Sequence, residues 1–193
     1  MANILVVSNG RPHGNTAQLA DSFACGAKAA GHQVEIISLL QTKVEPCLGC
    51  NACKRGKPCV QQDGFAGLVP KIHGADLLVL ASPLYYWTIS ARTKAFIERL
   101  YSISIPDSAP PLGRYEKYPD KDCALLMTAA DDLFWTFSQA ASYYRFTLVN
   151  YLGFRDKGML LAGGCGGSYS RPEIHKTEHL DRAYEFGKSV YKS

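Results

Sequence analysis

Five short apolar runs, separated by segments of helical periodicity, constrain the fold of this chain more than any other feature. The runs occupy residues 3–7, 34–37, 77–80, 123–127 and 158–161. Helices are predicted at residues 15–30, 64–73, 90–101 and 134–151, and from Pro172 onward. Short runs of Val, Ile and Leu are typical of strands buried on both faces, and an intervening helix lets successive strands run parallel. The alternation predicts an α/β chain with one five-stranded parallel sheet between two helical layers.

Length and charge limit the classes of protein that this chain can belong to. Its 193 residues are enough for a substantial core, and we expect a single domain over residues 1–193. The net charge of +4 is mild and the cations are scattered, so nucleic acid is not favoured as a partner. Met1 leads almost directly into the first strand, and no apolar run approaches membrane-spanning length. We therefore expect a cytoplasmic protein with no membrane partner.

The loop after the first apolar run has the chemistry of a phosphate-binding site. It reads Ser8-Asn9-Gly10-Arg11-Pro12-His13-Gly14-Asn15-Thr16 and opens an Ala-rich helix. Free backbone N–H groups and the positive end of the helix dipole favour an anion there. Ser8, Asn15 and Thr16 can add hydrogen bonds, Arg11 can add a charge-assisted one, and His13 lies within the loop. The alternative is an ordinary strand–helix turn with a capped helix.

The loop after the third run is expected to face the phosphate loop. With strand order 2-1-3-4-5, strands 1 and 3 are neighbours whose helices leave on opposite faces, which opens a crevice at their carboxyl ends. This second loop, residues 81–89, contains the consecutive aromatics Tyr85, Tyr86 and Trp87. Such side chains can stack on a planar apolar ring while backbone groups bind its edge. They could alternatively form an interface between subunits, and the two roles can coexist.

Four of the seven cysteines crowd into a polar insertion after the second strand, as Cys47, Cys50, Cys53 and Cys59. In a cytoplasmic protein such crowding indicates metal, cluster or redox chemistry more than a disulfide framework.

These motifs make the chain similar to the NAD(P)H-dependent FMN reductase family of flavodoxin-like proteins. The matching residues are Ser8-x-x-Arg11-x-x-Gly14-Asn15-Thr16, the Cys47–Cys59 segment, and Ser82-Pro83-Leu84-Tyr85 followed by Ser90-Ala91-x-x-Lys94-Ala95-Phe96-Ile97-Glu98-Arg99. The resemblance covers most of the chain and is weakest over residues 103–120. It implies a flavodoxin-like three-layer sandwich, non-covalently bound FMN, and NAD(P)H as co-substrate. Electrons would pass to a flavin, a quinone or a similar small-molecule or protein acceptor.

The same resemblance assigns roles to individual residues. The FMN phosphate would be held by Ser8, Arg11, Asn15 and Thr16, with His13 beside it. The isoalloxazine ring would be lined by Pro83, Leu84, Tyr85, Tyr86 and Trp87, with Thr128 and Ala129 on its other flank. Because the cofactor carries hydride and single electrons, no side chain is expected to act as a catalytic nucleophile. A homodimer or homotetramer is expected.

Within that family the chain is also similar to the iron–sulfur flavoproteins. Their compact four-cysteine motif corresponds to Cys47-x-x-Cys50-x-x-Cys53-x5-Cys59, and four thiolates at this spacing can ligate one [4Fe–4S] cubane. Free or redox-active thiols and a structural zinc site are the alternatives. The insertion is expected on the same rim of the sheet as the phosphate loop. Lys94 and Arg99 are expected to face solvent or to pack.

A separate pattern, Cys165 followed by Arg171, matches the Cys-x5-Arg loop of phosphatases. A thiolate beside Arg at a helix N-terminus has a lowered pKa and can attack a phosphoester. A Gly-rich turn beside the flavin is the simpler interpretation. The leading hypothesis is therefore an FMN-dependent NAD(P)H oxidoreductase. The alternative is an iron–sulfur flavoprotein electron carrier, and the remote alternative is a phosphatase.

Overall fold

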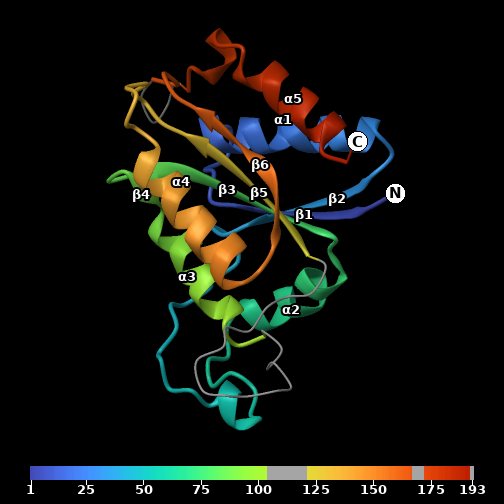
Figure 1. Ribbon diagram of the computed structural model, residues 1–193, viewed down its shortest axis with the longest axis vertical. Coiled ribbons are helices and arrows are strands. Elements are labelled where there is room, and N and C mark those ends of the chain that lie inside the picture. The colour runs from blue at the N-terminus through green and yellow to red at the C-terminus, as the bar shows by residue number, and fades with distance from the viewer. Residues whose placement is uncertain (104–120, 167–171, 192–193) are drawn as a thin grey trace.

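A parallel sheet forms the centre of the computed structural model, which describes residues 1–103, 121–166 and 172–191. Its parallel strands are β1 (Asn3–Ser8), β2 (Gln33–Ser38), β3 (Leu77–Tyr85), β5 (Asp122–Thr128) and β6 (Arg155–Ala162). They are ordered β2-β1-β3-β5-β6, which confirms the predicted topology (Figure 1). A two-residue strand, β4 (Thr88–Ile89), pairs antiparallel with the end of β3 and was not predicted, because so short a strand shows no periodicity.

Helices cover both faces of the sheet (Figure 1). On one face lie α1 (Asn15–Ala29) and α5 (His179–Ser189), and on the other lie α2 (Phe65–Gly74), α3 (Ala91–Leu100) and α4 (Ser138–Tyr144). Side chains alternate between these layers along each strand. In β1, Ile4 and Val6 pack in the core beneath α1, whereas Leu5 and Val7 pack in the core beneath α2.

Two glycines let α1 and α5 touch along their backbones. A Cβ atom at Gly26 would lie 1.9 Å from the Tyr184 carbonyl oxygen, and one at Gly187 would lie 2.0 Å from the Phe23 carbonyl oxygen. Any larger residue would force the helices apart. This contact fixes α1, and therefore its N-terminal end, against the sheet.

The fourth helix begins later and is less regular than its sequence predicts. The sequence predicts a helix over residues 134–151, whereas α4 begins at Ser138 and continues as π-helical turns over Arg145–Tyr151. A turn comes first, in which the Leu133 N–H donates to the Thr136 hydroxyl at 2.9 Å. Phe134 is 99% exposed in that turn, so it does not belong to the apolar face of the helix.

The last helix also begins later than predicted. The sequence places its start at Pro172, but a 3-10 turn, Ile174–Lys176, comes first and α5 begins at His179. Thr177 separates them because its backbone is extended, and its hydroxyl accepts from the His179 N–H at 3.2 Å. Among the helices that the structure describes, none is both long and apolar enough to cross a membrane.

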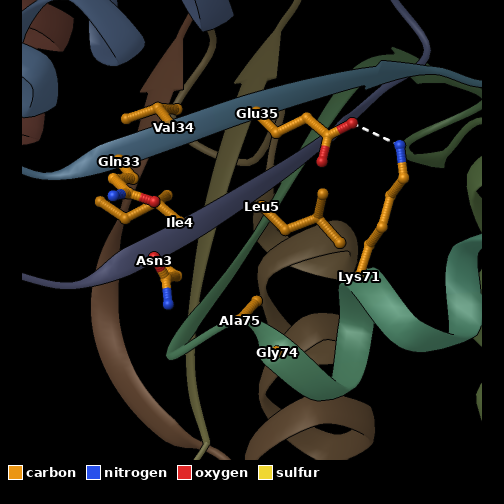
Figure 2. Close-up of a pocket in the computed structure, with 9 residues that line it drawn as sticks. All are labelled: Asn3, Ile4, Leu5, Gln33, Val34, Glu35, Lys71, Gly74 and Ala75. Atoms are coloured by element: carbon orange, nitrogen blue, oxygen red, sulfur yellow. Dashed lines mark hydrogen bonds and ion pairs between the residues drawn. The ribbon is translucent and has the colours of Figure 1, made fainter.

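A groove of about 320 Å³ lies at the amino ends of β1 and β2. Figure 2 shows the residues that line it. The Lys71 ammonium of α2 contacts the Glu35 carboxylate of β2 at 2.5 Å beside it. Ligands of open parallel sheets bind at the carboxyl ends of the strands, which is the opposite edge. The groove is therefore remote from the edge of the sheet where a ligand is expected.

Candidate functional site

A pocket of about 430 Å³ lies at the carboxyl ends of β1, β3 and β5. Most of its walls come from three segments far apart in the sequence: the loop after β1 with the start of α1, the end of β3, and the end of β5 with the residues that follow it. Leu40, after β2, and Arg92, in α3, complete the lining. The three segments meet because the parallel register pairs Ser8 with Ala81 and Pro83 with Thr128. Eight residues predicted from the sequence line it: Arg11, Asn15, Thr16, Pro83, Leu84, Tyr85, Thr128 and Ala129.

The end of the pocket formed by α1 is suited to an anion. Gly14 is the N-cap of α1, so no side chain caps the helix, and its first turn contains no acidic residue. Its terminal N–H groups are therefore available to a ligand, and the helix dipole is positive there. A Cβ atom at Gly10 would lie 2.4 Å from the Ala17 nitrogen, so only glycine lets the loop lie against the helix. Arg11 adds a positive charge to the same wall.

Thr16 and Thr128 join the floor of the pocket. Their hydroxyl oxygens are 2.6 Å apart, and both residues are buried. This bond ties the first turn of α1 to the end of β5, so the two walls keep a fixed separation.

The Asn15 side chain holds a neighbouring loop. Its amide nitrogen donates to the Cys165 carbonyl at 3.0 Å, and its amide oxygen accepts from the Ile174 N–H at 3.1 Å. Both ends of the amide are thus used within the protein. What Asn15 offers an anion most directly is its backbone N–H.

Ser8 and His13 are not among the residues that line the pocket. Ser8 is buried, and its hydroxyl accepts from the Gly10 N–H at 3.1 Å, which shapes the loop. His13 is exposed with a φ of 58°, and its carbonyl accepts from the Gln18 amide at 2.8 Å.

Tyr86 and Trp87 form the tight turn between β3 and β4. Their φ values are 47° and 58°, so both adopt the left-handed conformation that a two-residue type I′ hairpin requires. Non-glycine residues rarely do so, and such strain gathers at functional sites. Both line a second pocket of about 290 Å³ that adjoins the first and shares Leu84 and Ala129 with it. The Trp87 ring lies 5.6 Å from that of Trp135.

Asn9 is a pocket residue that the sequence analysis missed. It is 7% exposed, and its amide nitrogen donates to the Ser90 hydroxyl at 2.7 Å. Its amide oxygen is buried and has no partner among the described residues, although Asn9 lines the pocket. No local pattern marks Asn9, because Asn is common in turns and its partner lies 81 residues away. Arg92, at the start of α3, was missed in the same way.

Cys165 does not have the surroundings of a nucleophile. It is 1% exposed, and its thiol donates to the Ala162 carbonyl at 3.2 Å. Burial raises the pKa of the thiol to about 11, whereas a reactive cysteine needs a lowered pKa. Arg171 lies outside the described residues. The geometry at Cys165 therefore does not support the phosphatase alternative.

The four clustered cysteines line one small cavity. Cys47, Cys50, Cys53 and Cys59 surround a space of about 20 Å³ together with Arg99 and Tyr101, at the C-terminal end of α3. In the described part of the chain, no three His, Cys, Asp or Glu side chains lie close enough together to hold one metal ion.

The cavity of the four cysteines does not lie where the sequence predicts it. The sequence predicts the segment on the same rim as the phosphate loop, but the segment extends past the far end of α3 (Figure 1). The N-terminal end of α3 reaches the main pocket through Arg92. A helix of 10 residues is about 15 Å long, so the two sites lie at opposite ends of α3.

The sheet order, the open N-terminus of α1 and the aromatic loop across the crevice define a flavodoxin-like protein. The model of the family described as NADPH-dependent FMN reductase matches residues 2–131. The chain belongs to this family.

The curated relatives of this chain are named iron-sulfur flavoproteins. The chain is 30% identical over 100 residues to an iron-sulfur flavoprotein of Archaeoglobus fulgidus, covering 52% of this chain and 46% of that protein. It is 35% identical over 89 residues to an iron-sulfur flavoprotein of Methanocaldococcus jannaschii, covering 46% of each. The matched region thus spans about half the length of these relatives.

Solved structures confirm the fold. An NAD(P)H:quinone oxidoreductase from Methanothermobacter marburgensis superposes with a TM-score of 0.74 at 17% identity, covering 99% of this chain and 96% of that one. An FMN-dependent NADH-azoreductase from Bacillus anthracis, in complex with FMN, superposes with a TM-score of 0.67 at 15% identity, covering 98% of both chains. At these identities the likeness concerns the fold alone.

Proposed function

We propose that the protein is an FMN-dependent NAD(P)H oxidoreductase, formed by one flavodoxin-like domain over residues 1–193. Its electrons pass to a flavin, a quinone or a similar acceptor. The observation that carries the proposal is the pocket in which an uncapped helix N-terminus, a cation and an aromatic loop meet at the switch point of the sheet. Membership of the FMN reductase family supports it.

The pocket residues fit FMN. The phosphate would be held by Arg11, by Thr16 and by the backbone N–H groups from Asn15 onward, because the Gly14 N–H already donates to the Arg11 carbonyl at 2.9 Å. Ser8 shapes the loop, and His13 lies at its outer side. The Asn9 amide oxygen, which has no partner among the described residues, is a ready acceptor for a ligand hydroxyl. When bound, FMN supplies hydride and single-electron chemistry.

The protein itself binds and orients the flavin ring and the nicotinamide or acceptor that reacts with it. Residues 83–85 form one wall for the flavin ring, and Thr128 and Ala129, at the end of the neighbouring strand, line the pocket beside them. Tyr86 and Trp87 border the adjoining pocket, which is the place for the nicotinamide or the acceptor. Because the strained β3–β4 turn holds these aromatics in place, little ordering is needed when a substrate binds.

Flavin titration of wild type and Arg11→Ala tests the proposal. A hydrogen bond to a charged group contributes about 1.5–3 kcal/mol, so the variant should bind FMN about 10- to 150-fold more weakly. Lys71→Ala, in the remote groove of Figure 2, removes a cation far from the pocket and should bind FMN as wild type does. Equal affinity in all three proteins, or no NADPH oxidation with FMN and quinone, would contradict the proposal.

The exposed aromatic residues support an oligomer as part of this proposal. Tyr86 is 91% exposed and Phe134 is 99% exposed, and the nearby Trp87 and Trp135 rings are in contact. Apolar patches of this kind mark interaction surfaces. We infer a homodimer or homotetramer that uses this surface and acts in the cytoplasm. Sedimentation of wild type and Phe134→Ser tests it, because the variant should dissociate at higher concentration.

The second candidate is an iron–sulfur flavoprotein that carries electrons through a [4Fe–4S] cluster. It is favoured because four thiols line one cavity, and soft thiolates are the ligands that such clusters need. The names of the curated relatives agree. Since no three of the thiols converge in the described structure, the segment must tighten around a cluster. Iron and sulfide analysis of protein purified without oxygen tests this candidate. It predicts about four irons per chain, whereas an iron-free protein would contradict it.

A further inference from the structure

Arg99 is a buried cation beside the four cysteines. It is 1% exposed, although the sequence analysis allows it to face solvent. One guanidinium nitrogen donates to the Asp63 carboxylate at 2.6 Å and to the Glu45 carbonyl at 3.1 Å, and the group lies 4.9 Å from the centre of the Phe65 ring. Its Nε atom is buried and has no partner among the described residues. The side chain lines the cavity of the four thiols.

The contacts around Arg99 fix both ends of the cysteine segment. The Asp63 carboxylate also accepts from the Glu45 N–H at 2.8 Å, which joins the start of the segment to its end. The Gln61 amide donates to the Pro46 carbonyl at 2.7 Å. The Cys47 N–H donates to the Glu98 carboxylate at 3.0 Å, which ties the first cysteine to α3. The thiols are thus carried by a loop whose base is anchored at Arg99.

A buried N–H donor of a charged group destabilises the protein unless an acceptor is supplied, for example by a ligand. The side chains on the cavity wall that can become anionic include those of Cys47, Cys50, Cys53 and Cys59. Thiolates and bound sulfide accept N–H donors, and such hydrogen bonds set the potentials of iron–sulfur centres.

We propose that Arg99 is a positioning residue of the four-cysteine site. Held by Asp63, its positive charge and its Nε–H group would stabilise the thiolates and the bridging sulfides of a cluster whose irons those thiolates ligate. This inference rests on the second candidate function. Because one-electron reduction adds a negative charge to the bound cluster, Arg99 should favour the reduced form and slow the loss of iron.

The test uses reconstitution of the full chain with iron and sulfide under anaerobic conditions. Removing Arg99 alone leaves the largely buried Asp63 carboxylate without its opposite charge, so the main variant is the double substitution Arg99→Gln/Asp63→Asn, which removes both charges together. Arg99→Lys keeps the positive charge but loses the planar guanidinium group and its set of N–H donors. Lys43→Gln is the matched control, because Lys43 is an exposed cation at the base of the same loop. Reduction potential, iron release to a chelator and FMN affinity are measured for each protein.

We expect the double variant to bind FMN normally but to release iron at least tenfold faster than wild type. Its reduction equilibrium should shift at least tenfold toward the oxidised form, which is 59 mV for one electron, because the lost positive charge lines the cavity whereas the lost Asp63 charge does not. Arg99→Lys should shift it less, and Lys43→Gln should match wild type because solvent screens its charge.

Two results would overturn the proposal. One is a double variant with wild-type potential and iron release, and the other is a wild-type protein that takes up no iron. FMN affinity, read in the same samples, reports separately on the proposed reductase function. A protein that binds FMN but no iron refutes only the role of Arg99 and the cluster.

Discussion

The hydrogen bond between Thr16 and Thr128 offers a quantitative test of how the pocket floor is held. The two hydroxyls are 2.6 Å apart, and the residues are 4% and 5% exposed. Valine has nearly the shape of threonine without the hydroxyl. Each single change to Val leaves the other hydroxyl buried without its partner, and such a group costs about 1–3 kcal/mol. Replacing both leaves no orphan, which can be nearly neutral.

We therefore expect Thr16→Val and Thr128→Val each to lower the free energy of unfolding by about 1–3 kcal/mol. The double variant should lose less than the sum of the two, with a coupling energy within the range of about 0.5–3 kcal/mol for residues in contact. Urea unfolding followed by circular dichroism measures all four proteins. They must be free of FMN, because a bound ligand adds stability by mass action.

The slope of the urea transition is the internal control. If it is constant across the four proteins, the differences report stability alone. Additive single effects, with coupling below about 0.5 kcal/mol, would show that the two hydroxyls do not share a buried bond. The clamp between α1 and β5 would then be wrong.

Three further predictions concern other parts of the chain. Gly26→Ala should destabilise the protein by about 1–3 kcal/mol because its Cβ would meet the α5 backbone. Gly67→Ala, with open space around it, should stabilise the protein by up to about 1 kcal/mol. Thermal unfolding measures both, and changes in stability of the same sign in the two variants would contradict this prediction. Cys165 should resist alkylation at mildly alkaline pH while the exposed cysteines react, because burial raises its pKa to about 11; mass spectrometry after labelling checks it. Burial alone would raise the pKa of Asp63, but the Arg99 and backbone hydrogen bonds outweigh it and hold the pKa below 3.8. Its stabilisation is thus present above pH 3.8 and is lost as the pH falls further, so Asp63→Asn should show a weaker pH dependence of unfolding in acid.

The strands and their parallel direction could be predicted because each apolar run is a strand and a helix separates it from the next. Their order came from the flavodoxin-like arrangement, because right-handed crossovers allow more than one order of five parallel strands. Helix boundaries were less predictable. Phe134 has the spacing of a core residue but lies in an exposed turn, because the Thr136 hydroxyl caps Leu133 locally. Thr177 separates a 3-10 turn from α5 in a stretch whose sequence reads as one helix.

The sequence by itself determined the sheet, the anion-ready loop after β1 and the aromatic loop that faces it. These features are local, since a strand followed by a Gly-containing loop and a helix creates open N–H groups wherever it folds. Only the tertiary structure decided that Asn9 meets Ser90, that Thr16 meets Thr128, and that Arg99 lies buried beside the cysteines. Those contacts join residues brought together by strand register and helix packing. Their chemistry depends on burial, which no local pattern of residues reveals.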